Sequence, residues 1–469
     1  MLLKIKKEEG NMKLRKIIAI VLASTMTLAL LAGCGSSSGG STEKESTEGS
    51  TESSTEASGE EATEGAATSS DEIVTLTLLK DPDNSNAGLE KVAELAEEKI
   101  GVKIDIEERV AGGEGDNLVK TRLASGDMAD ICLYNSGAKF AALNPSEYFM
   151  DISGEDFVSR LDDTYKETVT VDGVTYGVPF SSTQVGAAIY NKKVYEELNL
   201  EVPRSWDEFL ANCEAIKASG TTALLGTFGD SWTTQLIFLG DQYAVEVEVP
   251  DFPEEFEAGR AKYETTPAAI ASLQKYVDTR DFYNDDYLAA TYSDGVDMIA
   301  NGEAAHWFML SQAIGSIGEL YPEELDNIGV FAIPGKSAET TGITAWMPSS
   351  LYGNKHSEHQ DAIKKFMEFW VSDEALDAYT SAVTPDGPYA IKGYELPDDA
   401  CDAVRVDIQE YYNNNKVGAA LEFKTSVKGA NCEGIMQEII TGQISAEEAA
   451  KAYDEDCLKQ AIQLGLDWE

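Results

Sequence analysis

Polar and aromatic residues follow two of the strands that the sequence predicts, at the point where each strand ends. Asp81 to Asn84 come after an alternating apolar run that begins at Ile73, and Tyr134 to Ser136 follow a third apolar run. In open α/β sheets, ligands bind outside the carboxyl ends of the strands. Carboxylate, amide and hydroxyl groups beside an aromatic ring can hydrogen-bond to and stack on a small organic molecule. The two loops therefore predict a single binding crevice.

The elements that position these loops alternate between strand and helix. Alternating apolar residues predict a first strand over 73–78, and helical spacing predicts a helix over 87–100 that ends at a glycine. A strand over 102–106, a helix over 116–124 and a strand over 129–134 follow. This succession is typical of a right-handed parallel α/β unit.

The rest of the chain also mixes strands and helices. The sequence predicts a hairpin around Asp172-Gly173 and a helix whose N-cap is Ser205, with Glu208 completing a capping box. Helices then dominate and are interrupted by short apolar strands at 223–227, 304–308, 328–333 and 343–351. The predicted fold class is α/β.

Residues that would support catalysis or metal binding are not arranged in the patterns those chemistries need. The sequence contains no nucleophile elbow, HExxH or P-loop motif. Beyond Cys34 five cysteines remain, widely spaced and without a CxxC pair; they allow one disulfide of unreadable pairing and argue against a zinc site. His356 and His359 lie among glutamates and predict an exposed helix start. We therefore expect no metal and no cofactor.

Length and charge limit the classes of partner. The chain has 469 residues, a formal charge of −47 and a pI near 4.2, so it would repel a nucleic-acid backbone. About 400 residues remain beyond the N-terminal segments, which is more than one hydrophobic core usually serves. Two lobes and no nucleic-acid partner are expected.

The N-terminus predicts export and anchoring. A basic patch at 13–16 precedes an apolar run at 17–31, about fifteen residues long and too short to span a membrane. The sequence Leu-Ala-Gly-Cys at 31–34 resembles the lipobox of bacterial lipoproteins, in which the cysteine is lipid-modified. We expect 1–33 to be a cleaved signal peptide and Cys34 to anchor the chain to the extracellular face of the cell membrane.

The segment from Cys34 to residue 70 separates this anchor from the folded part. It consists almost entirely of Ser, Thr, Glu, Gly and Ala, with too little apolar surface to offset chain entropy. We expect a disordered tether.

Several motifs resemble one known family. Leu-Ala-Ser-Gly-Asp-Met-Ala-Asp at 123–130 resembles the "L-x-S-G-D-x-P-D" segment of extracellular solute-binding proteins of carbohydrate ABC importers, the group that includes maltose-binding protein. Further similar segments occur in the family's order, at 173–179, 189–192, 203–209, 301–307, 362–374 and 442–449. The resemblance runs from about Ile73 to the C-terminus.

This resemblance implies a two-lobed periplasmic-binding-protein-like fold of type II, with hinge crossings between the lobes. The solute-binding domain would be 71–469. The first lobe would take about 71–180 plus 311–349, and the second about 181–310 plus 350–469. We expect a monomer whose lobes close over a ligand.

The resemblance also implies the binding residues. A sugar has an apolar ring face and an edge of hydroxyls, so its site needs flat aromatic surfaces and hydrogen-bonding groups. Carried over position by position, the substrate-binding residues are Asp83, Asn84, Tyr134, Asn135, Gln184, Asp230, Trp232, Trp307, Trp346 and Tyr389.

The implied function is capture of a sugar or oligosaccharide and its delivery to the permease subunits of an ABC transporter, without enzymatic activity. The membrane partner would be reached through the lipid on Cys34. Three alternatives stay open: a binding lipoprotein for a peptide, polyamine or organic acid, a surface glycan hydrolase with two suitably spaced carboxylates, and an adhesin.

Overall fold

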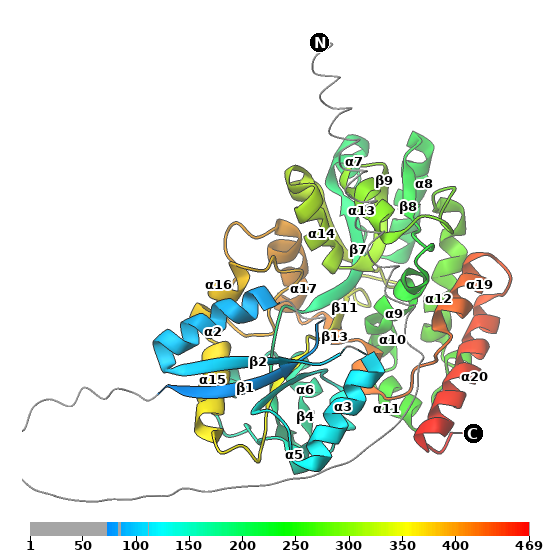
Figure 1. Ribbon diagram of the computed structural model, residues 1–469. Coiled ribbons are helices and arrows are strands. Elements are labelled where there is room, and N and C mark those ends of the chain that lie inside the picture. Colours follow the sequence, from blue (N-terminus) through cyan, green and yellow to red (C-terminus); the bar gives the residue numbers. More distant parts are fainter. Residues whose placement is uncertain (1–72, 83–85, 111, 469) are drawn as a thin grey trace, which may run out of the picture. The chain divides into compact units, whose positions relative to one another are not determined.

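The computed structural model describes residues 73–82, 86–110 and 112–468, and it builds them around two large β-sheets with flanking helices (Figure 1). Residues 69–469 form one compact unit. The predicted signal peptide, Cys34, the tether and the predicted binding residues Asp83 and Asn84 lie outside the described residues. Within the described part, none of the helices combines the length and the apolar character that crossing a membrane requires.

The first sheet has five strands in the order β2-β1-β3-β12-β6. Strand β1 (Val74–Lys80) pairs in parallel with β2 (Val102–Glu108) and β3 (Ile131–Tyr134). Helices α2 (Asn86–Ile100) and α3 (Gly112–Ser125) connect these strands in turn. The predicted strand–helix–strand–helix–strand unit is therefore confirmed.

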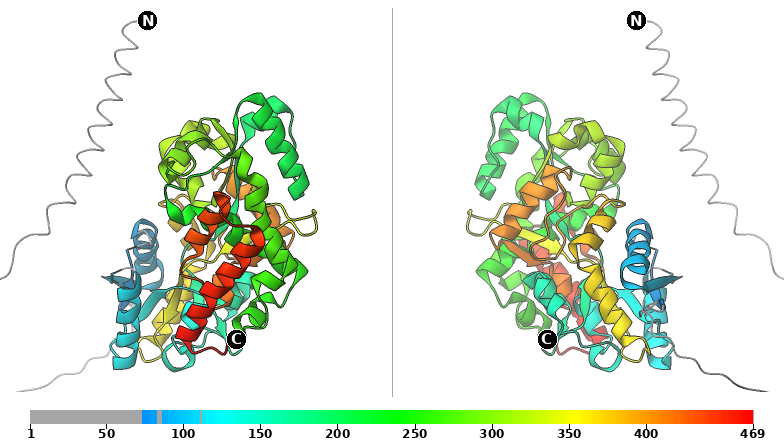
Figure 2. Two further views of the ribbon diagram at one scale, coloured as in Figure 1. Left: turned by 90° about the vertical axis from the view of Figure 1, so that its right-hand side faces the viewer. Right: turned by 90° about the vertical axis from the view of Figure 1, so that its left-hand side faces the viewer.

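Segments far away in the sequence complete this sheet. β12 (Ser350–Gly353) pairs antiparallel with both β3 and β6 (Gly177–Pro179). Helices α15 (Gln360–Trp370) and α16 (Asp373–Thr380) pack against α2, and the two views of Figure 2 place the yellow α15 near the blue N-terminal part of the sheet. The first lobe therefore depends on contacts across nearly 300 residues of sequence.

The second sheet is organised by β7 (Gln184–Asn191). One edge of β7 pairs with β9 (Ala304–Leu310), and the other edge pairs with β11 (Ile343–Trp346) and then with β10 (Ile328–Ala332), all antiparallel. Two further strands extend the sheet in parallel at its edges: β8 (Thr222–Leu225) beside β9, and β13 (Val417–Ala419) beside β11.

Both faces of the second sheet are buried. Successive residues of β7 belong to different apolar cores. Ala187 and Ile189 lie in one core, and Ala188 and Tyr190 lie in the other. Successive residues of a strand point to opposite faces, so a strand covered on both sides needs a continuous apolar run. The burial of β7 over 185–191 fits this requirement.

Helices cover the second sheet, and one predicted cap is confirmed. Ser205 is the N-cap of α8 (Trp206–Ser219), where its Oγ accepts a hydrogen bond from the Glu208 N–H at 3.3 Å. The Glu208 carboxylate reaches back to the N–H of Arg204 at 2.7 Å, one residue before the predicted position. Further helices here are α7 (Lys192–Leu198), α12 (Pro267–Thr279), α13 (Tyr292–Ala300), α14 (Gln312–Leu320), α19 (Cys432–Ile440) and α20 (Ala446–Leu464).

Shorter elements fill the connections. The predicted hairpin is confirmed as β4 (Thr170–Val171) paired with β5 (Val174–Thr175), with Asp172 and Gly173 at positive φ between them. The short helices are α4 (Ala138–Ala141), α5 (Pro145–Tyr148), α6 (Asp163–Thr168), α9 (Leu236–Gly240), α10 (Gln242–Glu248), α11 (Phe252–Glu257), α17 (Gln409–Asn413) and α18 (Leu421–Lys424).

Strand pairing corrects the predicted division between the lobes. β10 and β11, which lie within 311–349, join the second sheet, whereas β12 joins the first sheet and the next two helices, α15 and α16, pack against α2 of the first lobe. The physical reason is that the apolar run predicted as one strand over 343–351 is two strands. Met347 to Ser349 lie between them and carry the chain from one sheet to the other.

The chain passes between the two sheets three times, and the crossings are hydrogen-bonded together. The first crossing is 180–183, the second is 347–349, and the third follows α16 and leads to β13. The Phe180 N–H donates to the Ser349 carbonyl at 2.9 Å, and the Thr183 N–H donates to the Pro388 carbonyl at 2.8 Å. These crossings form the floor of the site described next.

Candidate ligand-binding cleft

A cleft of about 650 Å³ opens where the two lobes face each other across the crossings. We call it the inter-lobe cleft. The first lobe contributes the end of β3, α3 and α4, and the second contributes β11, α18 and the end of α20. Its lining includes Asp116, Lys120, Tyr134, Asn135, Ser136, Lys139, Ser181, Ser182, Gln184, Trp346, Met347, Pro348, Ser349, Glu422, Phe423 and Lys428. Four of the predicted binding residues are thus brought together: Tyr134, Asn135, Gln184 and Trp346.

Tyr134 is held at the end of β3 with its ring largely buried, at 2% exposure. Burial raises the pKa of its phenol, and the negative charge of the nearby Asp116 carboxylate raises the pKa further. The guanidinium of Arg109 lies over the ring, 5.7 Å from its centroid. Tyr134 therefore offers an edge and a polar tip to the cleft and not a broad ring face.

Trp346 provides the exposed aromatic surface. Its indole N–H donates to Glu422 Oε1 at 2.5 Å, and Glu422 Oε2 pairs with Lys428 Nζ at 2.7 Å. A methyl group at Gly186 would lie 2.7 Å from the ring, so this glycine lets the indole pack closely against β7. The ring is half-buried and fixed in orientation, which suits stacking against an apolar ligand face.

Asn135 and Gln184 supply hydrogen-bonding groups. The Asn135 backbone carbonyl accepts from the Tyr352 hydroxyl at 3.1 Å, while its side-chain amide forms no hydrogen bond to another described residue. Gln184 uses its Nε2 toward Asp386 at 2.8 Å, which leaves its Oε1 available. Both side chains are partly exposed at the cleft and can bind hydroxyl groups.

The other four predicted residues within the described part do not line this cleft. Asp230 accepts a hydrogen bond from the Tyr292 N–H at 2.7 Å and so stabilises the start of α13. Trp232 is half-buried with its ring centroid 5.8 Å from that of Tyr292. Trp307 is only 1% exposed, and its indole N–H donates to Thr227 Oγ1 at 3.3 Å.

Tyr389 is also mostly buried, at 7% exposure, and its hydroxyl accepts from Thr380 Oγ1 at 3.0 Å. Its backbone bridges to Ser182 in the first crossing. Ligand contact by Asp230, Trp232, Trp307 and Tyr389 stays a prediction, and for Trp307 it would require a rearrangement that exposes the ring.

The sequence did not point to the wall formed by residues 422–428. Gly137 has φ +72°, and a side chain there would collide with the backbone of Phe423 at 2.6 Å. This glycine lets Phe423 of α18 approach the backbone of the first lobe closely at residue 137. The only hint in the sequence was a glycine just after a predicted strand end, which can allow a close backbone approach. It does not reveal that the approaching residue is Phe423, nearly 290 residues later.

The net charge of the cleft lining differs from the strongly negative net charge of the whole chain. Lys120, Lys139 and Lys428 face two acids, Asp116 and Glu422, so three positive charges minus two negative charges leave one positive. Lys139 lies 3.8 Å from Asp116, and Lys428 lies 2.7 Å from Glu422. Within a chain of net charge −47, this near-neutral lining favours an uncharged ligand over a cationic one.

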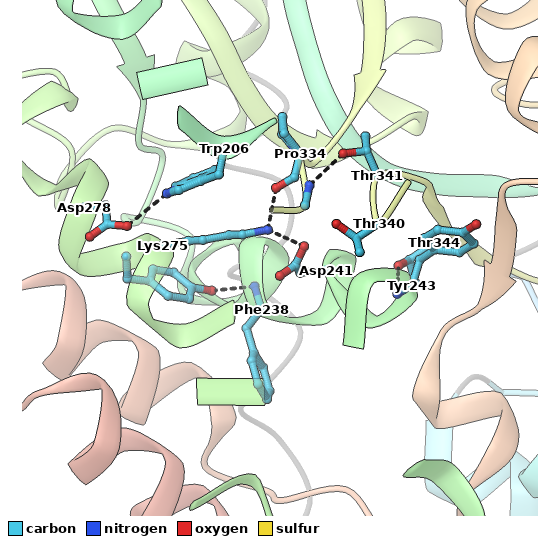
Figure 3. Close-up of polar contacts among 12 residues, drawn as sticks. Trp206, Phe238, Asp241, Tyr243, Lys275, Asp278, Pro334, Thr340, Thr341 and Thr344 are labelled. Carbon is cyan, nitrogen blue, oxygen red and sulfur yellow. Dashed lines mark hydrogen bonds and ion pairs between the residues drawn. The ribbon is translucent and has the colours of Figure 1, made fainter. Parts of the chain in front are cut away.

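A second cavity, of about 330 Å³, lies inside the second lobe between α8, α10, α12 and the 335–340 loop. We call it the lobe-two cavity. Its buried polar groups bind one another (Figure 3): Lys275 Nζ donates to Asp241 at 2.5 Å and to the Pro334 carbonyl at 2.7 Å, and the Trp206 indole N–H donates to Asp278 at 2.9 Å. Because these groups satisfy each other, this cavity is a weaker candidate than the cleft.

The cysteine and histidine side chains of the described residues form neither a disulfide nor a metal site. Their five cysteines are all free, and no group of three or more His, Cys, Asp or Glu side chains is arranged there to hold a metal ion. His306 is fully buried, and its Nδ1–H donates to the Ala223 carbonyl at 2.7 Å. Its Nε2 accepts from the Tyr195 hydroxyl at 2.6 Å, and burial lowers its pKa to about 4.

Two α/β lobes joined by three crossings, with a polar and aromatic cleft between them, define a solute-binding protein of the two-lobed class. The apo form of RafE from Streptococcus pneumoniae has the same fold, with a TM-score of 0.69 and 21% identity, covering 85% of this chain and 99% of that one. RafE in complex with raffinose aligns with a TM-score of 0.64 and 23% identity, covering 82% of this chain and 99% of that one.

The chain belongs to the bacterial extracellular solute-binding protein family, whose family model matches residues 82–377. Among curated proteins, the chain is 28% identical over 347 residues to the multiple sugar-binding protein of Streptococcus mutans serotype c. That alignment covers 70% of this chain and 78% of the relative.

Proposed function

We propose that this protein is a lipid-anchored substrate-binding protein that captures a sugar or oligosaccharide in the inter-lobe cleft and delivers it to an ABC transporter permease. The observation that carries the proposal is the pairing of a fixed, half-exposed indole at Trp346 with the available amides of Asn135 and Gln184. Sugar binding by the similar Streptococcus mutans protein and by RafE supports the choice of ligand class.

The chemistry of the cleft supports a neutral polyhydroxylated ligand. A stacking surface beside hydrogen-bonding groups matches the two faces of a sugar. A polyamine would need an excess of acids, whereas the lining has three lysines and two acids. Binding in the micromolar range, about −8 kcal/mol, would suit both capture and release.

The test is calorimetric titration of residues 69–469, which form one compact unit, against neutral mono- and oligosaccharides, uronic acids, amino acids, peptides and polyamines. We expect binding of one saccharide class only. A ligand present at a hundredfold excess over its Kd would also raise the unfolding free energy by about 2.7 kcal/mol. Binding confined to charged or peptidic ligands would instead support the alternative of a non-sugar binding lipoprotein, and hydrolysis of an oligosaccharide during the titration would contradict the non-enzymatic role.

Anchoring and delivery need their own experiments. Mass spectrometry of the mature protein should find an N-terminal lipid-modified Cys34, and Cys34→Ala should release the protein from the membrane fraction. Loss of the gene should abolish uptake of the labelled saccharide identified by calorimetry. Uptake that continues unchanged would contradict the delivery step.

A further inference from the structure

The third crossing brings a carboxylate against the first crossing at the floor of the inter-lobe cleft. Asp386 Oδ1 accepts from the Ser182 hydroxyl at 2.5 Å, and Asp386 Oδ2 accepts from Gln184 Nε2 at 2.8 Å. Ser182 and Gln184 both line the cleft, whereas Asp386 lies behind them. One carboxylate therefore holds two side chains that a ligand can reach.

The backbone around this contact leaves little freedom for it to shift. The Thr183 N–H donates to the Pro388 carbonyl at 2.8 Å. A methyl group at Gly387 would lie 1.7 Å from the Thr183 carbonyl oxygen, so the two segments touch where only glycine fits. The register between Asp386 and residues 182–184 is thus fixed by the main chain.

No basic side chain forms an ion pair with Asp386 within the part of the chain that the structure describes. Burial raises the pKa of this carboxyl group, and the hydrogen bonds from Ser182 and Gln184 oppose that rise. The hydroxyls of Tyr379 and Tyr389 lie close enough for the Asp386 charge to help raise their pKa values. Ser182 and Gln184 are therefore the side chains whose hydrogen bonds favour the ionised form of Asp386, against the effect of burial.

In its ionised form the Asp386 carboxylate only accepts hydrogen bonds, and this form determines how both neighbours are oriented. The single hydroxyl proton of Ser182 is committed to Asp386. The Gln184 amide must turn its Nε2 toward Asp386, because the reverse orientation would place Oε1 against a negatively charged oxygen. What remains for a ligand is the Ser182 lone pairs, the Gln184 Oε1 and the second N–H of Gln184 Nε2, and the Oε1 acceptor is the group whose orientation Asp386 fixes.

We propose that Asp386 is a positioning residue that fixes the Gln184 amide so that its Oε1 accepts from the ligand, and so selects ligands that present an O–H or N–H donor to that oxygen. The inference rests on the proposed sugar-binding function and adds to it a rule of specificity. At this position the ligand presents a free hydroxyl, and a group that can only accept, such as fluorine or a methyl ether, is rejected.

The experiment compares wild-type protein with Asp386→Asn, titrating each with D-galactose, D-glucose and the complete monodeoxyfluoro series of both sugars. In a deoxyfluoro sugar one hydroxyl donor is replaced by an atom that only accepts. For the wild type we expect about a tenfold loss of affinity at one hydroxyl position from the missing donor at the hinge. In Asp386→Asn the Gln184 amide can turn its N–H toward the cleft, so this penalty should shrink while the penalties at other positions stay.

A merely structural role for Asp386 would weaken all the sugars by a common factor and keep the pattern of penalties, and this result would overturn the proposal. The matched control is Asp377→Asn, which alters an exposed carboxylate that also accepts a hydroxyl, from Tyr394 at 3.0 Å. Gln184→Met serves as a second variant if Asp386→Asn does not fold. It should remove the same position-specific penalty, and its retention would equally overturn the proposal.

The experiments distinguish failure of the proposed sugar-binding function from failure of the positioning role of Asp386. If wild-type protein binds no saccharide in the wider panel, the proposed function fails. The orientation is then decided by nuclear magnetic resonance of the Gln184 side-chain amide in the ligand-free protein. Slowed exchange of its N–H₂ protons in the wild type and fast exchange in Asp386→Asn would support the positioning role, and identical exchange in both would contradict it.

Discussion

The inter-lobe cleft and the lobe-two cavity are both lined by charged and aromatic side chains, but their polar groups are used differently. In the lobe-two cavity Lys275, Asp241 and Trp206 are nearly buried and bind one another (Figure 3). In the cleft Asn135 and Gln184 keep unused hydrogen-bonding capacity at a partly exposed surface. A buried group must be satisfied within the fold, whereas a binding site retains groups for its ligand.

This difference predicts that changes in the lobe-two cavity alter stability and that changes in the cleft alter binding. Lys275→Met would leave Asp241 buried without its counter-charge, and we expect a loss of about 3–5 kcal/mol in the free energy of unfolding. Urea denaturation measures it. Lys336→Met, at an exposed position on the rim of the same cavity, is the control and should change stability by less than about 0.5 kcal/mol. A small effect of Lys275→Met would mean that the pair is not buried in solution.

The second prediction concerns His306, which is buried in the second lobe. Burial lowers its pKa from 6.5 to about 4, so the unfolded chain takes up a proton before the folded chain does. The free energy of unfolding therefore contains the full contribution of the neutral imidazole above pH 6.5. It decreases by about 3 kcal/mol as the pH falls toward 4.

Unfolding free energies of wild type and His306→Gln, measured from pH 7.5 to 4, test this sign. The difference between them should shrink as the pH falls, because only the wild type carries the depressed group. His356→Gln, which changes a histidine outside the core, should run parallel to the wild type. A pH-independent difference for His306→Gln would contradict the burial of a neutral imidazole.

The third prediction addresses the cleft. Trp346→Ala should weaken saccharide binding by about 2 kcal/mol, because it removes the fixed aromatic surface. Calorimetry with the saccharide identified above measures this change. Trp307→Ala is the informative comparison: its ring is buried, so the main effect should be lost stability of about 3–5 kcal/mol. Normal stability with lost affinity in Trp307→Ala would restore the role that the family resemblance implied.

The smallest expected effect is at Glu422. Glu422→Gln keeps an acceptor for the Trp346 indole but removes the charge that pairs with Lys428. Because the pair is partly exposed, we expect binding to weaken by at most about 1 kcal/mol. Lys424→Met, which alters a neighbouring lysine that pairs with Glu246, should leave affinity unchanged. A tenfold loss in the control would indicate that α18 is sensitive to substitution in general.

Local patterns predicted the elements well where neighbours in sequence decide the structure. The α/β unit over 73–134, the hairpin at Asp172-Gly173 and the Ser205 cap all depend on residues within a few positions of each other. The cleft was only partly predictable for the same reason. Tyr134 and Asn135 follow a strand whose end faces ligands in this sheet type, so their position could be inferred from the unit itself.

Residues whose roles depend on distant partners were predicted less well. The Trp307 sequence context does not reveal that Gly295 admits its ring into the core, where a methyl group would lie 2.6 Å away. The assignment of 311–349 to the first lobe was wrong for its strands because strand partners, and not strand propensity, decide which sheet a segment joins.

The sequence by itself determined the fold class, the family and the order of helices and strands, because apolar periodicity, turn residues and motif spacing are local properties of the chain. Only the tertiary structure decided which aromatic rings reach the cleft, and that Asp386 lies behind Gln184, some 200 residues earlier in the chain. Those facts depend on three crossings that meet in space, and the cost of burying unsatisfied polar groups determines how the side chains at that meeting point are arranged.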